Sequence, residues 1–67
     1  MQRNLVHSSR IRSVGWGNNV LEIEFPDGAI YHYENVSYIE YVAFINSPSL
    51  GSSLTRIEKK HTYYPVN

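Results

Sequence analysis

Hydrophobic and polar residues alternate along the first half of the chain with a period of two, which is typical of half-buried β-strands. The clearest segment is Val20–Phe25, in which leucine, isoleucine and phenylalanine share one face and two glutamates lie on the other. Two further segments, Ser9–Trp16 and Ala29–Glu34, are also rich in apolar residues. Gly17–Asn19 and Pro26–Gly28 separate the three segments, and their residues suit tight turns. The pattern predicts a three-stranded antiparallel meander.

The period changes to that of an amphipathic helix near Ser37. Ser37 is followed three residues later by Glu40, a capping-box pattern that predicts a helix start at this serine. Asn46–Pro48 ends the helical pattern, because proline cannot continue a helix. Four apolar positions share one stripe of this predicted helix and are expected to face the core: Tyr38, Tyr41, Val42 and Ile45.

A second helix is predicted to begin between Ser49 and Ser53 and to run to about Lys60. Two lysines lie in its last turn, where positive charge suits the helix dipole. Tyr63–Pro65 is expected to form an extended tail. The whole chain, residues 1–67, is therefore predicted to be one α+β domain in which both helices pack on one face of the three-stranded sheet.

The composition limits how so small a domain can be stable. A chain of 67 residues builds only a modest core, and this one contains no cysteine. Its three histidines are too scattered for a zinc motif, so we expect neither a metal nor a cofactor. Aromatic residues make up 13% of the chain, which favours a well-packed aromatic core together with self-association, most simply as a homodimer.

The charge balance argues against extended contact with nucleic acid. Six lysines and arginines are matched by six acidic residues, whereas proteins held mainly by phosphate contacts usually carry a positive excess. A local basic pocket is compatible with this balance. No signal peptide is recognised, and no apolar stretch approaches the ~20 residues of a membrane-spanning helix, so a cytoplasmic location is expected.

The segment Ser49–Ser53 is the strongest candidate for a ligand site. Small hydroxylated residues and Gly51 lead into the predicted second helix, and Arg56 follows about one turn later. Backbone N–H groups at a helix start attract anions, and a guanidinium group can bind two phosphate oxygens at once. The alternative is an ordinary N-cap with serine turns. The predicted phosphate contacts from this segment are Ser49, Gly51, Ser52 and Arg56, with Arg56 as the main charge.

Ser8, Ser9 and Arg10 form a second polar cluster near the N-terminus. Arg10 and Arg12 are expected to share one strand face. This face is either a second edge that contacts the ligand or an ordinary solvated surface.

Tyr31 and Tyr33 lie on one face of a predicted strand, on either side of His32. They are either core aromatics beneath the helices or a platform on which bases stack.

No arrangement of residues indicates catalysis. No serine lies in a Gly-x-Ser-x-Gly segment, and no spacing brings a nucleophile, a base and an orienting group together. We therefore expect a binding module and not an enzyme.

An ordered set of short motifs extends along almost the whole chain and resembles the KTSC domain, a module named for its occurrence at the C-terminus of some lysyl-tRNA synthetases. The resemblance implies a module without established enzymatic activity that is suspected of binding RNA, and that also occurs free-standing in bacteria and phages. The matching motifs are Ser8-Ser9-x-Ile11, Val14-Gly15-Trp16, Leu21-x-Ile23-x-Phe25, Asp27-Gly28, Tyr31-x-Tyr33, Val36, Tyr41, Ser49-x-Gly51, Ile57 and Tyr63-Tyr64-Pro65.

Two kinds of ligand follow from this resemblance. Some free-standing phage proteins act as sponges for nucleotide immune signals, and this chain is similar to them in size and composition. The resemblance thus implies either a phosphate-bearing, nucleotide-type small molecule or RNA. Net neutrality favours the small molecule, because a few phosphates need only a local Arg10, Arg12 or Arg56. A protein-interaction domain without a small-molecule pocket is the third alternative.

Overall fold

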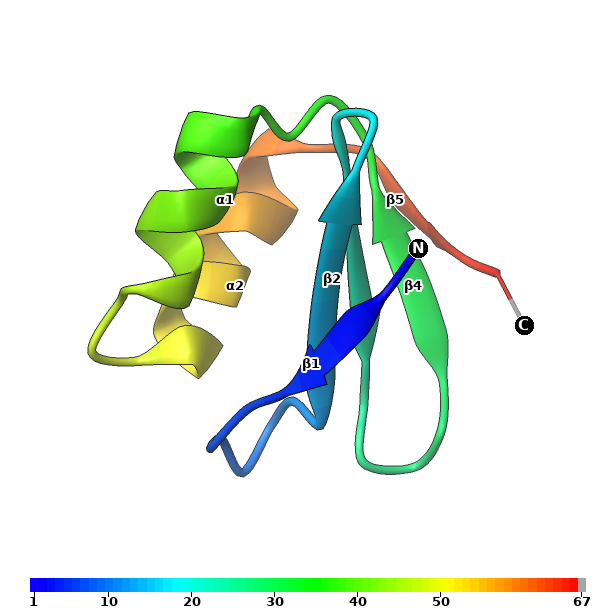
Figure 1. Ribbon diagram of the computed structural model, residues 1–67, viewed down its shortest axis with the longest axis vertical. Helices are drawn as coiled ribbons and strands as arrows, with labels where there is room; N and C mark the ends of the chain where they lie inside the picture. Colours follow the sequence, from blue (N-terminus) through cyan, green and yellow to red (C-terminus); the bar gives the residue numbers. More distant parts are fainter. Residues whose placement is uncertain (67) are drawn as a thin grey trace.

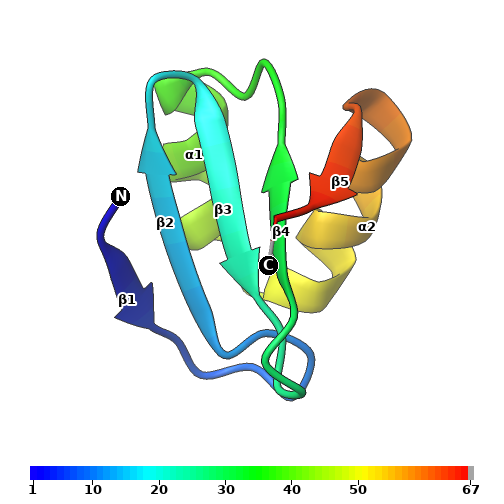
Figure 2. The same ribbon diagram turned by 90° about the vertical axis from the view of Figure 1, so that its right-hand side faces the viewer.

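A five-stranded antiparallel sheet and two helices on one of its faces make up the fold in the computed structural model, which describes residues 1–66 (Figure 1). The strands lie side by side in the order in which they occur along the chain (Figure 2). This arrangement confirms the predicted α+β class. The elements in order are β1 (Arg3–Leu5), β2 (Ser13–Gly17), β3 (Val20–Glu24), β4 (Ile30–Tyr33), α1 (Tyr38–Ile45), α2 (Leu50–Lys60) and β5 (Tyr63–Pro65).

The prediction of three strands is wrong, because β1 and β5 extend the meander at its two edges. β1 pairs with β2, and β5 pairs with β4. The N-terminal and C-terminal segments therefore form the two edge strands of the sheet. Each added strand has only three residues and no alternation that could be recognised. Pairing with the exposed edge of a neighbouring strand, and not a pattern in its own sequence, gives such a segment its strand conformation.

The segment before β2 also differs from the prediction. β2 begins at Ser13, four residues later than expected, so Arg10 and Arg12 do not share a strand face. The predicted turns are confirmed. Asn18 and Asn19 both have positive φ angles, of 53° and 63°, as the two-residue turn between paired strands requires.

The core lies between the sheet and the helices. The pairing register places the core residues of β2, β3 and β4 on one face, since Ile23 lies opposite both Val14 and Tyr31. The helices cover this face (Figure 1). The buried hydrophobic residues are Ile11, Val14, Leu21, Ile23, Tyr33, Val36, Phe44, Leu54 and Ile57.

The predicted core stripe of α1 is confirmed only in part, because Tyr41 packs against the core and Val42 is half-buried but the other two positions are not covered. Phe44 is the buried residue of this helix, whereas Tyr38 and Ile45 are exposed. The reason is that seven of the eight residues of α1 are apolar or aromatic, with Glu40 as the exception. A helix that is apolar on every side gives no periodic signal that selects its inner face.

Both helices begin within the predicted ranges: α1 on the predicted N-cap Ser37, and α2 on Ser49, which acts as the ordinary N-cap given as the alternative to a ligand site. The Ser37 hydroxyl accepts a hydrogen bond from the Glu40 amide at 3.1 Å, and the Ser49 hydroxyl accepts one from the Ser52 amide at 3.3 Å. The Glu40 carboxylate lies 2.8 Å from a ring nitrogen of His61, the C-cap residue of α2. This contact connects α1 to the end of α2.

We predict that Gly15→Ala destabilises the fold. A Cβ atom on Gly15 would lie 2.7 Å from the backbone oxygen of Gln2, so β1 would have to move away from β2. The free energy of unfolding, measured with urea, should fall by about 1–3 kcal/mol. The matched control is Gly17→Ala, because the nearest atoms there are 4.0 Å away on a flexible methionine. Equal unfolding curves for the two variants would contradict the prediction.

Candidate functional site

A surface pocket of about 310 Å³ brings together the two polar clusters that the sequence suggested. We call it the Arg10 pocket. Its two sides come from segments far apart in the sequence, the loop before β2 and the start of α2. Among the predicted contact residues, it contains Ser8, Ser9, Arg10, Ser49, Gly51 and Ser52.

The Arg10 side chain is held against the first turns of α2. Its Nη1 atom donates hydrogen bonds to the Gly51 carbonyl oxygen at 2.9 Å and to the Thr55 hydroxyl at 3.1 Å. Gly51 leaves the space for this contact, since a Cβ atom there would lie 2.9 Å from the arginine Cδ. Thr55 was not recognised from sequence, because nothing local links it to a residue 45 positions earlier.

The charge of Arg10 is not neutralised within the described residues. Arg10 makes no ion pair in residues 1–66, and no acidic residue lines the pocket. Among its side-chain nitrogens, only Nη1 donates to an acceptor within residues 1–66. A guanidinium group has five N–H donors, so several remain to bind an anion.

The start of α2 adds further donors to the pocket. The Ser49 hydroxyl satisfies the Ser52 amide, while the amides of Leu50 and Gly51 have no acceptor within residues 1–66. These amides belong to the first turn, which lacks partners inside the helix. Together with the serine hydroxyls they form a cluster of neutral donors beside one unpaired cation.

Arg56, predicted to be the main charge of this site, lies elsewhere. Its Nη2 atom donates to the Ser53 hydroxyl at 3.0 Å, three residues earlier on the same helix. It lines a separate hollow of about 470 Å³ to which both helices contribute. Glu40 lines the same hollow, so the surroundings of Arg56 include a negative charge. The structure therefore separates Arg56 from the other predicted contacts.

Tyr33 belongs to the core and is not open to a base. Its ring is fully buried and stacks on Tyr63 with centroids 5.0 Å apart. Burial, together with its hydrogen bond to the Glu58 carboxylate, raises the pKa of the Tyr33 hydroxyl far above its usual value. Tyr31 is half-buried and packs edge-to-face against Phe25. Neither tyrosine lines the Arg10 pocket.

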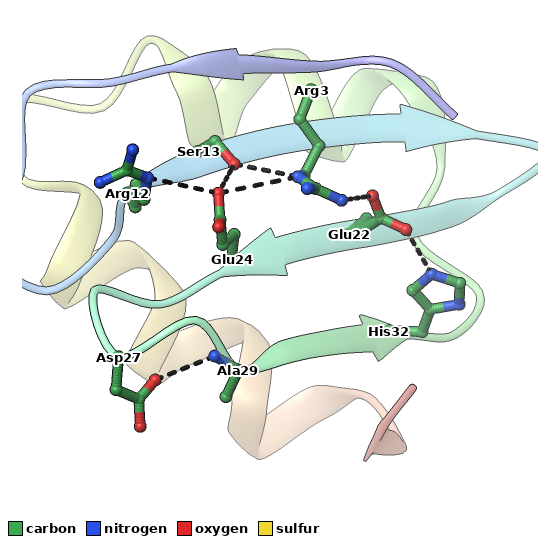
Figure 3. Close-up of polar contacts among 8 residues, drawn as sticks. All are labelled: Arg3, Arg12, Ser13, Glu22, Glu24, Asp27, Ala29 and His32. Carbon is green, nitrogen blue, oxygen red and sulfur yellow. Dashed lines mark hydrogen bonds and ion pairs between the residues drawn. The ribbon is translucent and has the colours of Figure 1, made fainter. Parts of the chain in front are cut away.

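A third cluster of polar side chains lies on the sheet face that the helices leave uncovered (Figure 3). Arg3 contacts both Glu22 and Ser13, Ser13 donates to Glu24 at 2.7 Å, and a His32 ring nitrogen lies 2.7 Å from Glu22. Each carboxylate therefore has a basic partner, and this network is satisfied by the chain itself. Its six members are Arg3, Arg12, Ser13, Glu22, Glu24 and His32.

Two other properties of the described chain bear on the kind of site. No group of three histidine, aspartate or glutamate side chains within residues 1–66 is placed to hold a metal ion. Neither helix of this part of the chain is long and apolar enough to cross a membrane.

Comparison with known proteins agrees with this architecture of two helices on one face of an antiparallel sheet. The KTSC domain family profile matches residues 7–63, and the chain belongs to this family. It is similar to the KTSC domain protein YPO2434 from Yersinia pestis, whose crystal structure superposes with a TM-score of 0.92 at 32% identity, covering 98% of this chain and 97% of that one. An uncharacterized protein of Stutzerimonas stutzeri (strain A1501) is 35% identical over 65 residues, which are 94% of this chain and 92% of that protein.

We predict that Glu22 makes stability depend on acid pH. Burial by itself raises the pKa of Glu22, but the hydrogen bonds from His32 and Arg3 outweigh it and hold the pKa below its usual range. A carboxyl whose pKa is lower in the folded state stabilises the fold above its unfolded pKa of about 4.3, and this contribution is lost as pH falls through the folded pKa. At neutral pH, Glu22→Gln should therefore lower the free energy of unfolding by roughly 1–3 kcal/mol.

Urea unfolding at neutral pH and at about pH 3 tests this prediction. The difference between wild type and Glu22→Gln should shrink in acid. Glu34→Gln is the control, because Glu34 makes no ion pair within residues 1–66 and should show little change at either pH. A difference that is the same at both pH values would contradict the assignment.

Proposed function

We propose that this KTSC domain binds a compact, phosphate-bearing ligand of the nucleotide type in the Arg10 pocket, without catalysing a reaction. The observation that carries the proposal is the Arg10 guanidinium, which is held against α2 with no ion-pair partner in residues 1–66. A phosphate group supplies the negative oxygens that this arrangement lacks.

The geometry suits a phosphate better than a carboxylate or a neutral ligand. A phosphate has several oxygens and can accept from the arginine fork, the Leu50 and Gly51 amides and a serine hydroxyl at the same time. Every group that lines the pocket is neutral or basic, because His7 and Arg10 are its titratable members. An anion there meets no opposing carboxylate.

The proportions of the site favour a small molecule over RNA. A pocket of about 310 Å³ is at the lower end of the range for small-molecule sites. The pocket offers a single arginine, and the chain carries no net positive charge. A track of phosphates along an RNA strand would need several cations in a row.

The hollow around Arg56 is the less suitable alternative. Arg56 already donates to Ser53, and Lys60 in the same hollow lies 3.6 Å from the Glu40 carboxylate. This hollow thus contains a carboxylate, that of Glu40, whereas the Arg10 pocket contains none. This difference makes Arg56 a matched control for Arg10.

We predict that Arg10→Ala weakens binding of adenosine monophosphate roughly 10- to 100-fold, the effect of losing hydrogen bonds to a charged group. Titration calorimetry or NMR titration of the full chain measures the affinity, and adenosine serves as the ligand without a phosphate. Arg56→Ala should bind as wild type does. Equal affinities for wild type and Arg10→Ala, both folded, would contradict the proposal.

Gly51→Ala provides a second test that does not remove the arginine. The added methyl group would lie only 2.9 Å from the Arg10 Cδ, so the arginine side chain must shift from its contact with α2. Alanine also favours the helix by up to ~1 kcal/mol, so folding should not suffer. Weaker binding in a variant that is folded as stably as wild type supports the site. If a short single-stranded RNA binds far more tightly than the mononucleotide, with steep salt dependence, the RNA alternative is correct.

We also propose that a second copy of the chain packs on the outer face of α1. Ile39 is 81% exposed and Tyr38 is 59% exposed on a helix whose only charged residue is Glu40. A helix that is apolar on all sides is normally covered on all sides. The Tyr38 ring also lies 5.3 Å from Trp16, which extends the apolar surface onto β2.

We predict that Ile39→Glu gives a folded monomer, whereas the wild-type chain forms a homodimer at high micromolar concentration. Sedimentation velocity measures the state of association. Thr62→Glu is the control, because it adds the same charge at an exposed position outside α1. A monomeric wild-type chain at this concentration would contradict the proposal.

A further inference from the structure

A second pocket, of about 510 Å³, has aromatic walls and is distinct from the Arg10 pocket. We call it the Tyr63 pocket. It lies where the turn after β3 and the strands β4 and β5 meet the last turns of α2. Its lining residues are Phe25, Pro26, Asp27, Ala29, Tyr31, Tyr33, Glu58 and Tyr63.

Three rings at this pocket are placed by contacts with one another. Phe25 and Tyr31 meet edge to face, with centroids 5.6 Å apart and planes at 86°. Tyr31 and Tyr63 lie 6.1 Å apart with planes tilted by 54°. Tyr63 is in turn backed by the buried Tyr33, on which it stacks, and 45% of Tyr63 remains exposed to solvent. The rings thus form walls at different angles that the core supports from behind.

Two carboxylates complete the lining. Glu58 accepts a hydrogen bond from the Tyr33 hydroxyl at 2.9 Å, and Asp27 accepts one from the Ala29 amide at 3.0 Å (Figure 3). Both partners are neutral donors, so both negative charges remain. Neither acid makes an ion pair within residues 1–66, and no lysine, arginine or histidine lines the pocket.

We propose that the Tyr63 pocket binds a small organic cation of the alkylammonium class. Aromatic faces attract an ammonium group through their negative quadrupole, and the attraction is strongest where water is partly excluded. The two carboxylates give the pocket the charge that such a ligand neutralises. Metal ions are less suitable, because rings replace the oxygen ligands that a hard cation requires.

This inference is independent of the proposed phosphate site. The two pockets share no lining residue, and they carry opposite charge. A failure of phosphate binding in the Arg10 pocket would leave the Tyr63 pocket unchanged.

Choline is a suitable probe, because a neutral analogue exists in which a tert-butyl group replaces the trimethylammonium group with nearly the same shape. Heteronuclear NMR titration of the full chain at constant ionic strength should show saturable shifts around Tyr31, Glu58 and Tyr63 with choline. The neutral analogue should bind at least about tenfold more weakly. Equal binding of the two compounds, or no saturable shifts with choline, would overturn the proposal.

Paired variants separate the contributions of charge and rings. Glu58→Gln keeps an acceptor for the Tyr33 hydroxyl but removes the charge, so choline should bind about tenfold more weakly. Glu34→Gln removes the same charge outside the pocket and should bind normally. Tyr63→Leu should weaken binding, while Tyr64→Leu should not, since Tyr64 is similarly exposed but does not line the pocket. Equal effects within either pair would also overturn the proposal.

The alkylammonium group could belong to a free small molecule or to a modified side chain of a protein. The affinity of a short glycine-flanked peptide that carries one trimethyllysine, compared with that of choline, distinguishes these two sources. Weaker binding of the peptide than of choline indicates a free small molecule, and tighter binding indicates a side chain of a protein partner. The control is a neutral peptide in which norleucine replaces trimethyllysine. Either result supports the alkylammonium assignment, provided that this control peptide does not bind. Binding of the norleucine peptide as tightly as the charged one would count against it.

Discussion

The Tyr33 side chain connects the sheet to the parts of the chain that follow it. On β4 it lies opposite Leu21 of β3 and Tyr63 of β5, its ring stacks on Tyr63, and its hydroxyl donates to Glu58 on α2. A buried tyrosine needs a partner for its polar end, and a carboxylate on a neighbouring helix meets that need. Because one side chain makes all of these contacts, the position of α2 and that of β5 depend on each other.

The two proposed pockets use opposite ends of α2. Arg10 contacts the first turns of the helix, whereas Glu58 lies near its last turn. A helix has a partial positive charge at its start and a partial negative charge at its end. The start thus favours an anion, as proposed for the Arg10 pocket, whereas Lys59 and Lys60 already complement the dipole at the end of the helix, where Glu58 supplies the negative charge of the Tyr63 pocket. This helix of 11 residues therefore contributes residues to both proposed pockets.

The sequence predicted the parts of the fold that are encoded by local periodicity. The alternation in Val20–Phe25 and the serine caps at Ser37 and Ser49 correspond closely to β3, α1 and α2. The role of Arg10 against α2 could not be read in this way. It depends on the space above Gly51 and on a contact across 41 positions. Arg56 was favoured because it is close in sequence, but its bond to Ser53 directs it elsewhere.

The short outer strands described above bear on how the sheet meets other chains. An exposed edge presents unpaired backbone groups on which a neighbouring strand can add, and long flat edges promote aggregation. Here β1 and β5 have only three residues each, and β5 ends at Pro65, which has no N–H group to donate. The sheet is thus protected against open-ended growth through its edges. The proposed association of two copies uses a helix surface instead, where packing can close after two chains.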